Sequence, residues 1–278
     1  MVKTISILGC GWLGTALGKK LLTKGLAVKG SVASAESYNQ LEITGIQTYH
    51  IKIEPEEVFI DYKNFFNTDV LIISLPPRGE DVKENFPKQI NQIIQLLNET
   101  KIGRIIFISS TSVYQSWNGV VREGDEGYPN KANGKALLLA EKILMGLPNV
   151  QTTVLRLGGL VGYDRNPGRF LLKKREVAAD SPVNLIHRDD AVEIIQQLIE
   201  KNIWGEVFNA CSPQHPTKRE FYTKAAKISN LPLPNFSGFV ENYKIVNSDK
   251  LVTRLGYTYK YISPMDYLKE LEEWAYRI

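Results

Sequence analysis

The stretch that decides the fold is TISILGCGWLG, residues 4–14. Residues 4–8 form an apolar run typical of a short buried strand, and residues 12–24 carry apolar side chains at helical spacing. Between them Gly9, Gly11 and Gly14 make the pattern G-x-G-x-x-G. A glycine-rich turn between a strand and a helix is the fingerprint of a dinucleotide-binding fold.

Each glycine has its own part in that fingerprint. Gly9 permits the tight turn, Gly11 lets the backbone approach a pyrophosphate, and Gly14 lets helix and strand pack closely. The start of the helix offers N–H groups and a partial positive charge to the phosphates. The alternative is a glycine-rich turn that binds nothing. We expect dinucleotide binding, because the flanking strand and helix supply the required context.

Composition excludes several classes of function. The net charge of the 278 residues is only +4, and lysines and arginines are scattered, so nucleic-acid binding is not expected. Two cysteines make no disulfide framework, and no apolar run is long enough to span a membrane, so we expect a cytoplasmic protein without membrane contact. Since no histidine, cysteine and glutamate residues have metal-ligand spacing, we expect no metal.

Strand-like and helix-like segments alternate along the chain, which predicts a parallel sheet covered on both faces. Strands are expected at residues 4–8, 27–33, 47–53, 69–75, 104–109, 152–157 and 206–210. Helices are expected at 12–24, 86–98, 133–145, 189–201, 218–229 and 264–276, with Asp189 as a helix N-cap. The fold class is therefore α/β, a Rossmann-type doubly wound parallel sheet with a small C-terminal substrate lobe.

The composition of the sequence changes past residue 160. We expect a dinucleotide-binding domain at residues 1–165, to which residues 183–210 return. Residues 166–182 and 211–278 are expected to form the small C-terminal lobe, which shapes the substrate pocket.

Four motifs resemble a known family in the correct order: SSTSVY at 109–114, RLGGLVG at 156–162, VNLIHRDDA at 183–191 and EVFN at 206–209. They are similar to those of the extended short-chain dehydrogenase/reductases, the NAD-dependent epimerase/dehydratase family. The resemblance covers essentially the whole chain. It implies an NAD(P)-binding oxidoreductase or epimerase acting on a small molecule, with a nucleoside-diphosphate sugar as the substrate class.

In that family a Tyr-x-x-x-Lys pair transfers the proton, and a serine hydrogen-bonds the reacting oxygen. The resemblance places Ser110 at the serine position, but the tyrosine and lysine positions read Asn133 and Leu137. Asparagine cannot act as an acid or a base near neutral pH, so this site departs from the family's pattern. Tyr114 is a candidate substitute acid, although the tyrosine of this motif more often forms a structural wall of the pocket.

Two functional readings follow from the missing pair. The first is an oxidoreductase or epimerase with a non-standard acid/base, built around Ser110 and Tyr114. The second is a non-catalytic dinucleotide-binding sensor or scaffold, which needs no proton transfer. The retained SSTSVY stretch favours the first reading.

The choice of coenzyme depends on the end of the second strand. An NAD site uses a carboxylate there to bind the ribose hydroxyls, but residues 30–36 read GSVASAE, with no carboxylate at the strand tip. Ser31 and Ser34 offer hydroxyls to a phosphate, so of NAD and NADP we favour NADP. The expected cofactor contacts are Gly9, Gly11, Trp12, Leu13, Gly14, Ser31, Ser34, Leu75, Pro76, Pro77 and Ser109.

The resemblance also bears on assembly. Members of this family pair through two long helices, for which residues 86–98 and 133–145 are the candidates in this chain. The same helices serve equally well as ordinary covers of the sheet, so a homodimer and a monomer both remain open.

Overall fold

The computed structural model describes residues 2–53, 58–59, 62–125, 127–163, 165–171, 176–238 and 242–275. The chain forms two compact units. Unit 1 comprises residues 1–113, 127–156 and 192–208, and unit 2 comprises residues 114–126, 157–191 and 209–278. Each unit therefore draws on segments that lie far apart in the sequence.

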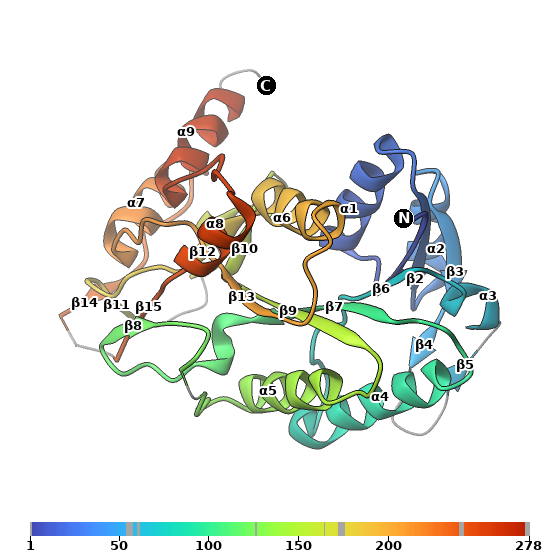
Figure 1. Cartoon of the computed structure of the whole chain (residues 1–278). Coiled ribbons are helices and arrows are strands. Elements are labelled where there is room, and N and C mark those ends of the chain that lie inside the picture. The colour runs from blue at the N-terminus through green and yellow to red at the C-terminus, as the bar shows by residue number, and fades with distance from the viewer. Residues whose placement is uncertain are drawn as a thin grey trace. The chain divides into compact units, whose positions relative to one another are not determined.

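A seven-stranded parallel sheet dominates the first unit (Figure 1). Its strand order is β13-β9-β7-β6-β1-β2-β3, so the chain winds outward from β1 in both directions. The strands are β1 (Thr4–Leu8), β2 (Ala27–Val32), β3 (Gln47–His50), β6 (Val70–Ile73), β7 (Arg104–Ser110), β9 (Gln151–Leu157) and β13 (Val207–Ala210). All four residues of β6 and the last four of β1 are buried, because these central strands have helices on both faces.

Helices cover both faces of this sheet. Figure 1 shows α1 and α6 on one face and α4 and α5 on the other. The helices that accompany this sheet are α1 (Trp12–Thr23), α2 (Ala35–Glu42), α3 (Tyr62–Phe66), α4 (Val82–Leu97), α5 (Ala132–Met145) and α6 (Arg188–Glu200). A short antiparallel pair, β4 (Lys52–Ile53) and β5 (Val58–Phe59), follows β3.

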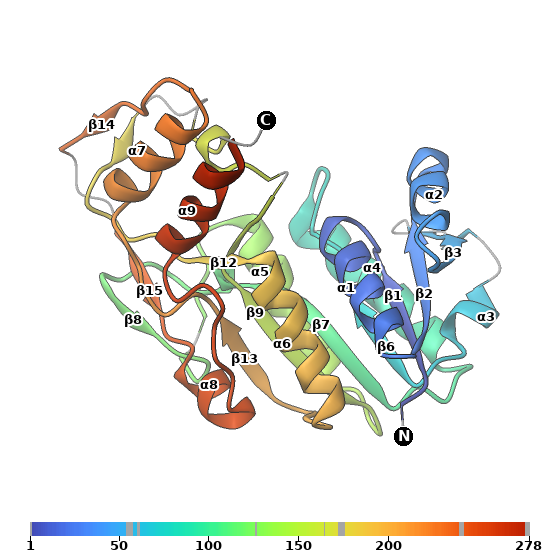
Figure 2. The ribbon, with the colours of Figure 1, turned by 90° about the horizontal axis from the view of Figure 1, so that it is seen from above.

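The described residues of unit 2 form three two-stranded parallel pairs. They join β10 (Gly159–Val161) to β12 (Leu185–His187), β11 (Val177–Ala178) to β14 (Phe236–Ser237), and β8 (Gly119–Val121) to β15 (Lys244–Val246). Its helices are α7 (Lys218–Ile228), α8 (Asp249–Leu255) and α9 (Pro264–Ala275), and α7 and α9 lie side by side (Figure 2). A buried cluster that includes Leu171, Phe221, Tyr261 and Leu268 forms the core beside them.

The structure confirms the α/β class and the doubly wound sheet, and it corrects several bounds. The third strand ends at His50, and residues 52–53 belong to the separate β4–β5 pair. Helix α4 begins a turn earlier than expected, at Val82, and runs through Pro87. Asp189 lies within the first turn of α6, not at its N-cap, because the helix begins at Arg188. Helices α2, α3 and α8 were not expected from the sequence.

Candidate dinucleotide site

The point where the sheet reverses its winding lies between β1 and β6. Ile5–Leu8 pair in parallel with Val70–Ile73, and the chain leaves the two strands toward opposite halves of the sheet. In open α/β sheets, ligands bind beyond the carboxyl ends of the strands at such a switch point. The loops that leave these two strands, residues 9–11 and 74–77, are therefore the candidate ligand site.

The conformation of the glycine loop explains its three glycines. Gly9 has φ +87°, and a Cβ there would lie 2.8 Å from the Ser74 carbonyl oxygen. A Cβ at Gly14 would lie 3.1 Å from the Gly9 oxygen and 3.1 Å from Ile7 Cγ2. A Cβ at Gly11 would meet no atom within 4 Å. Gly9 and Gly14 are thus fixed by the protein's own packing, whereas Gly11 is exposed and borders open space.

Helix α1 starts at this loop with its positive end uncompensated by side chains. Gly11 is the N-cap, no side chain caps the helix, and the first turn contains no acidic residue. The Gly11 N–H donates to the Gly9 carbonyl over 2.8 Å, and Leu13 is buried while Trp12 is half-buried. Such a helix start attracts an anionic group.

Ser31 supports the glycine loop through two hydrogen bonds. Its hydroxyl is buried and accepts the Gly9 N–H over 3.0 Å, while its carbonyl accepts the Cys10 N–H over 2.7 Å. Ser31 is therefore placed to hold the glycine loop in shape. Direct contact between this buried hydroxyl and a phosphate would require the loop to move.

Ser34 lies at the surface, at the start of α2. Its hydroxyl caps the helix by accepting the Ser37 N–H over 3.3 Å and donates to the Ser37 hydroxyl over 2.9 Å. Glu36, in the same first turn, is exposed. The region after β2 therefore presents the hydroxyl of exposed Ser34 and that of half-buried Ser37, together with one carboxylate.

The loop after β6 contacts the start of α5. The Asn133 side-chain amide donates to the Pro77 carbonyl over 3.4 Å. Leu75 and Pro77 are half-buried and Pro76 is exposed, and Leu75 reaches the glycine loop, where its Cδ2 would lie 2.9 Å from a Cβ on Gly9. The residue at the expected tyrosine position thus touches one of the loops expected to contact the cofactor.

Leu137 takes a different position on α5. Its side chain is 4% exposed and packs in the core, whereas Asn133 and Lys135 are exposed. Residues 133 and 137 therefore offer one amide and one core hydrocarbon, and neither side chain ionises near neutral pH to act as an acid or a base.

The end of β7 holds a buried charged network. Ser109 donates to Glu141 over 2.5 Å, and Glu141 accepts from Arg156 over 2.6 Å. All three residues are buried. The Ser109 hydroxyl therefore gives its hydrogen to this buried network. Two members of the network carry a sequence signal, because Ser109 belongs to the SSTSVY motif and Arg156 to the RLGGLVG motif.

Ser110 and Tyr114 have contrasting surroundings. Ser110 is half-buried, and its oxygen accepts the Ser112 N–H over 3.1 Å. This leaves the hydroxyl hydrogen of Ser110 able to donate. Tyr114 is 3% exposed and donates to the Asn209 side-chain oxygen over 2.8 Å. Sequence reasoning missed this contact, since the two residues are 95 positions apart.

Neither a metal site nor a membrane segment is found in the part of the chain that the structure describes. No group of three or more histidine, cysteine, aspartate or glutamate residues lies close enough to hold a metal ion. No helix there combines the length and the apolar character needed to cross a bilayer.

The chain is similar to a known protein in sequence and to several solved structures in fold. No family model matches the sequence. The chain is 33% identical over 269 residues to Protein YeeZ of Escherichia coli K12, covering 95% of this chain and 98% of YeeZ. Among solved structures, a putative NAD-dependent epimerase/dehydratase from Methylobacillus flagellatus superimposes with a TM-score of 0.78 at 21% identity, over 100% of both chains.

A second solved structure is similar to the same extent. UDP-glucuronic acid 4-epimerase from Bacillus cereus, in complex with UDP-glucuronic acid and NAD, superimposes with a TM-score of 0.81 at 20% identity, over 99% of both chains. These likenesses confirm the fold expected from the four motifs. The chain belongs to the family of Protein YeeZ and has the fold of the NAD-dependent epimerases and dehydratases.

Proposed function

We propose that the loop of residues 9–14 binds a nicotinamide dinucleotide and that the protein is an oxidoreductase or epimerase of nucleotide sugars with a non-standard acid/base. The observation that carries the proposal is the open space at Gly11, beside the uncapped start of α1 and at the switch point of the sheet. A pyrophosphate fits there because the backbone is bare and the helix end is positive.

The solved relatives support the choice of ligand. The B. cereus epimerase, which has the same fold over its whole length, was crystallised with NAD and UDP-glucuronic acid. By extension, the substrate class proposed for this chain is a nucleoside-diphosphate sugar.

A bound nicotinamide would supply hydride exchange, and the chain's own residues would bind and orient. In this proposal the glycine loop binds the pyrophosphate, and the free hydroxyl hydrogen of Ser110 bonds the reacting oxygen. Asn133 positions the Pro77 loop through its amide. The proton then comes from a group other than residues 133 and 137, and Tyr114 would supply it only after leaving Asn209.

We further propose that NADP is accepted in preference to NAD. The hydroxyls of exposed Ser34 and half-buried Ser37 at the start of α2 are suited to hydrogen-bond a phosphate. No carboxylate stands at the end of β2 itself to bind the ribose hydroxyls of NAD. Ser34→Asp would place a carboxylate at this N-cap and is expected to shift the preference toward NAD.

Calorimetric titration with NAD⁺, NADH, NADP⁺ and NADPH tests the binding site. Wild type is expected to bind at least one oxidised and reduced pair, and Gly11→Ala to lose that binding while remaining folded. Gly124→Ala is the matched control, because a Cβ there also meets no atom within 4 Å and the residue lies outside the loop. Failure of wild type to bind any of the four overturns the proposal.

A second function is favoured by one specific observation. Since Leu137 is buried in the core, α5 has no place for the usual lysine without repacking, which suits a dinucleotide-binding sensor or scaffold. Incubation with nucleotide sugars separates the two functions. Conversion that falls in Ser110→Ala supports the enzyme, whereas dinucleotide binding without conversion of any nucleotide sugar supports the sensor.

Assembly and location complete the proposal. We propose a homodimer through α4 and α5; on α5, Leu139 and Met145 are 44% and 41% exposed. We also propose a cytoplasmic protein with its thiols reduced. Light scattering of wild type and of Leu139→Lys tests the dimer, since the added charge is expected to give monomers.

A further inference from the structure

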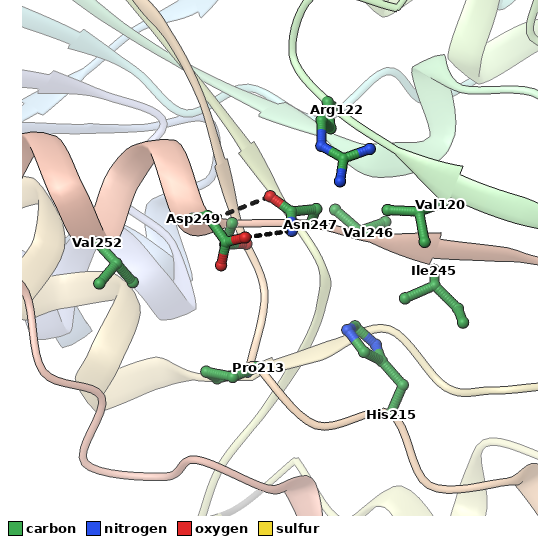
Figure 3. Close-up of a pocket in the computed structure, with 10 residues that line it drawn as sticks. Val120, Arg122, Pro213, His215, Ile245, Val246, Asn247, Asp249 and Val252 are labelled. Carbon is green, nitrogen blue, oxygen red and sulfur yellow. Dashed lines mark hydrogen bonds between the residues drawn. The ribbon is translucent and has the colours of Figure 1, made fainter.

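Unit 2 contains a pocket of its own, formed without any residue of the glycine loop (Figure 3). Its volume is about 180 Å³. The walls come from the β8–β15 pair, the loop after β13 and the start of α8. Val120, Pro213, Ile245 and Val252 make much of this lining apolar.

Arg122 supplies the pocket's positive charge. Its backbone N–H donates to Asp125 over 2.8 Å, but its guanidinium makes no ion pair or hydrogen bond with the described residues. In Figure 3 this guanidinium lies above the pocket, on the side of Asn247. A guanidinium without a partner binds a planar carboxylate through two parallel hydrogen bonds.

His215 supplies an acceptor on the opposite side. Its Nδ1 lies 3.1 Å from the Val183 carbonyl oxygen, which can only accept, so Nδ1 carries the hydrogen. Burial lowers the pKa of this imidazole, which favours its neutral form. The Nε2 lone pair is then left to accept from a ligand, and Figure 3 shows the ring extending into the pocket.

Asp249 limits what else can bind. The Asn247 amide donates to its carboxylate over 2.7 Å, and the Asp249 N–H donates back to Asn247 over 3.0 Å. This fixed negative charge on the rim opposes a second anionic group on the ligand. A ligand with one carboxylate is therefore favoured over one with two.

The pocket connects to a residue of the SSTSVY motif. The Asn247 carbonyl accepts from the Asn209 amide over 2.9 Å, and Asn209 accepts the Tyr114 hydroxyl over 2.8 Å. A ligand that shifts the backbone at Asn247 would thereby shift the Asn209 side chain, which accepts the hydrogen bond from the Tyr114 hydroxyl.

We propose that this pocket is a binding site for a small hydroxy-monocarboxylate with a branched apolar end, separate from the dinucleotide site. Arg122 binds the carboxylate, the His215 Nε2 accepts the hydroxyl hydrogen, and Val120, Ile245 and Val252 pack against the hydrocarbon. The site requires neither a dinucleotide nor turnover, so it stands independently of the proposed function.

Ligand-observed NMR titration with 2-hydroxyisovalerate, in the absence of nucleotide, tests the charge. Because a charge-assisted hydrogen bond contributes about 1.5–3 kcal/mol, Arg122→Gln is expected to weaken binding about tenfold or more. The control Arg169→Gln removes the same charge from an exposed arginine of unit 2 outside the pocket and should leave affinity within about twofold. Absence of binding to wild type, or equal loss in both variants, overturns the proposal.

The hydroxyl is tested by comparing 2-hydroxyisovalerate with isovalerate, which lacks it. Wild type should prefer the hydroxy acid, and His215→Phe, which keeps a ring but removes the acceptor, should bind both equally. A preference that survives in His215→Phe excludes the role given to this imidazole. Isopropylmalate, which adds a second carboxylate, should bind more weakly than either, and tighter binding would contradict the limit set by Asp249.

Discussion

Gly9 and Gly11 belong to one motif, but glycine is needed at the two positions for different reasons. Gly9 combines φ +87° with the Ser74 carbonyl 2.8 Å from its missing Cβ, whereas the space beside Gly11 is empty. Gly9→Ala is expected to destabilise the fold by about 2–3 kcal/mol or more, through backbone strain and the clash. Gly11→Ala should cost at most about 1 kcal/mol, the usual scale of a changed N-cap. Urea unfolding of both variants, each beside Gly124→Ala, measures the difference.

The opposite order of stability would contradict this assignment. If Gly11→Ala unfolded more readily than Gly9→Ala, the space beside Gly11 would be needed by the protein itself. It would then not be reserved for a ligand.

His187 gives a pH dependence that belongs to a single residue. The ring is 1% exposed, with ring centroids of Tyr261 at 4.1 Å and Tyr267 at 4.9 Å, and burial lowers its pKa to about 4. Between pH 6.5 and 4 the His187 imidazole is therefore protonated in the unfolded chain but neutral in the folded chain. Stability is full above pH 6.5 and falls with decreasing pH, by on the order of 3 kcal/mol in total.

Urea unfolding between pH 4.5 and 7.5 checks this sign. The decline toward low pH should be smaller in His187→Phe than in wild type. Asp189, Lys260, Glu270 and Arg188 also act on this imidazole, so the comparison is between slopes and not absolute stabilities. Parallel curves for the two proteins would show that His187 titrates normally in the fold.

At the residue scale, sequence reasoning reached the glycine loop but not the contacts that cross the fold. The loop was predictable because the need for its glycines follows from local backbone geometry. The bond between Tyr114 and Asn209 was not, because it joins residues 95 positions apart. The burial of Leu137 follows from which face α5 turns to the core, which spacing within a motif does not specify.

At the scale of elements, one buried network ties β7, α5 and β9 together. Ser109, Glu141 and Arg156 lie on these three elements, and each is buried. Arg156→Met leaves the Glu141 carboxylate buried without its cation, so we expect a loss of about 3–5 kcal/mol. The double variant Glu141→Leu/Arg156→Met should lose less than the sum of the single variants, because it leaves no buried charge.

A double-mutant cycle in urea measures this coupling. Lys20→Met and Glu193→Leu, whose ion pair between α1 and α6 is partly exposed, provide the control cycle, with an expected coupling of about 1 kcal/mol or less. Additive losses at Glu141 and Arg156 would mean that the two charges are separately solvated.

Elements with a strong apolar period were the ones the sequence predicted. Helix α5 and strand β7 differ from expectation by one residue at one end each. Helix α2 was missed because Leu41 is its only buried residue, so no apolar stripe marks it. Helix α8 is seven residues long, too short for a periodic pattern to emerge.

For the molecule as a whole, dinucleotide binding should leave a local trace. Hydrogen exchange should slow at residues 9–14, around the β2 tip at 31–34, and at Leu75, because these segments lie near the switch point. Mass spectrometry of deuterated wild type with and without NADP⁺ measures it, and Gly11→Ala should show no change. Protection confined to residues 209–275 would place the dinucleotide elsewhere.

The path of the chain between the two units has a consequence for synthesis. The chain leaves or re-enters unit 1 after residues 113, 126, 156, 191 and 208, and β13, an edge strand of the sheet, begins only at Val207. A ribosome must therefore release most of the polypeptide before either half has all its parts. A nascent chain that pauses earlier exposes the edge of β9, to which chaperones or neighbouring nascent chains have access, and a stop codon anywhere before β13 leaves neither half complete.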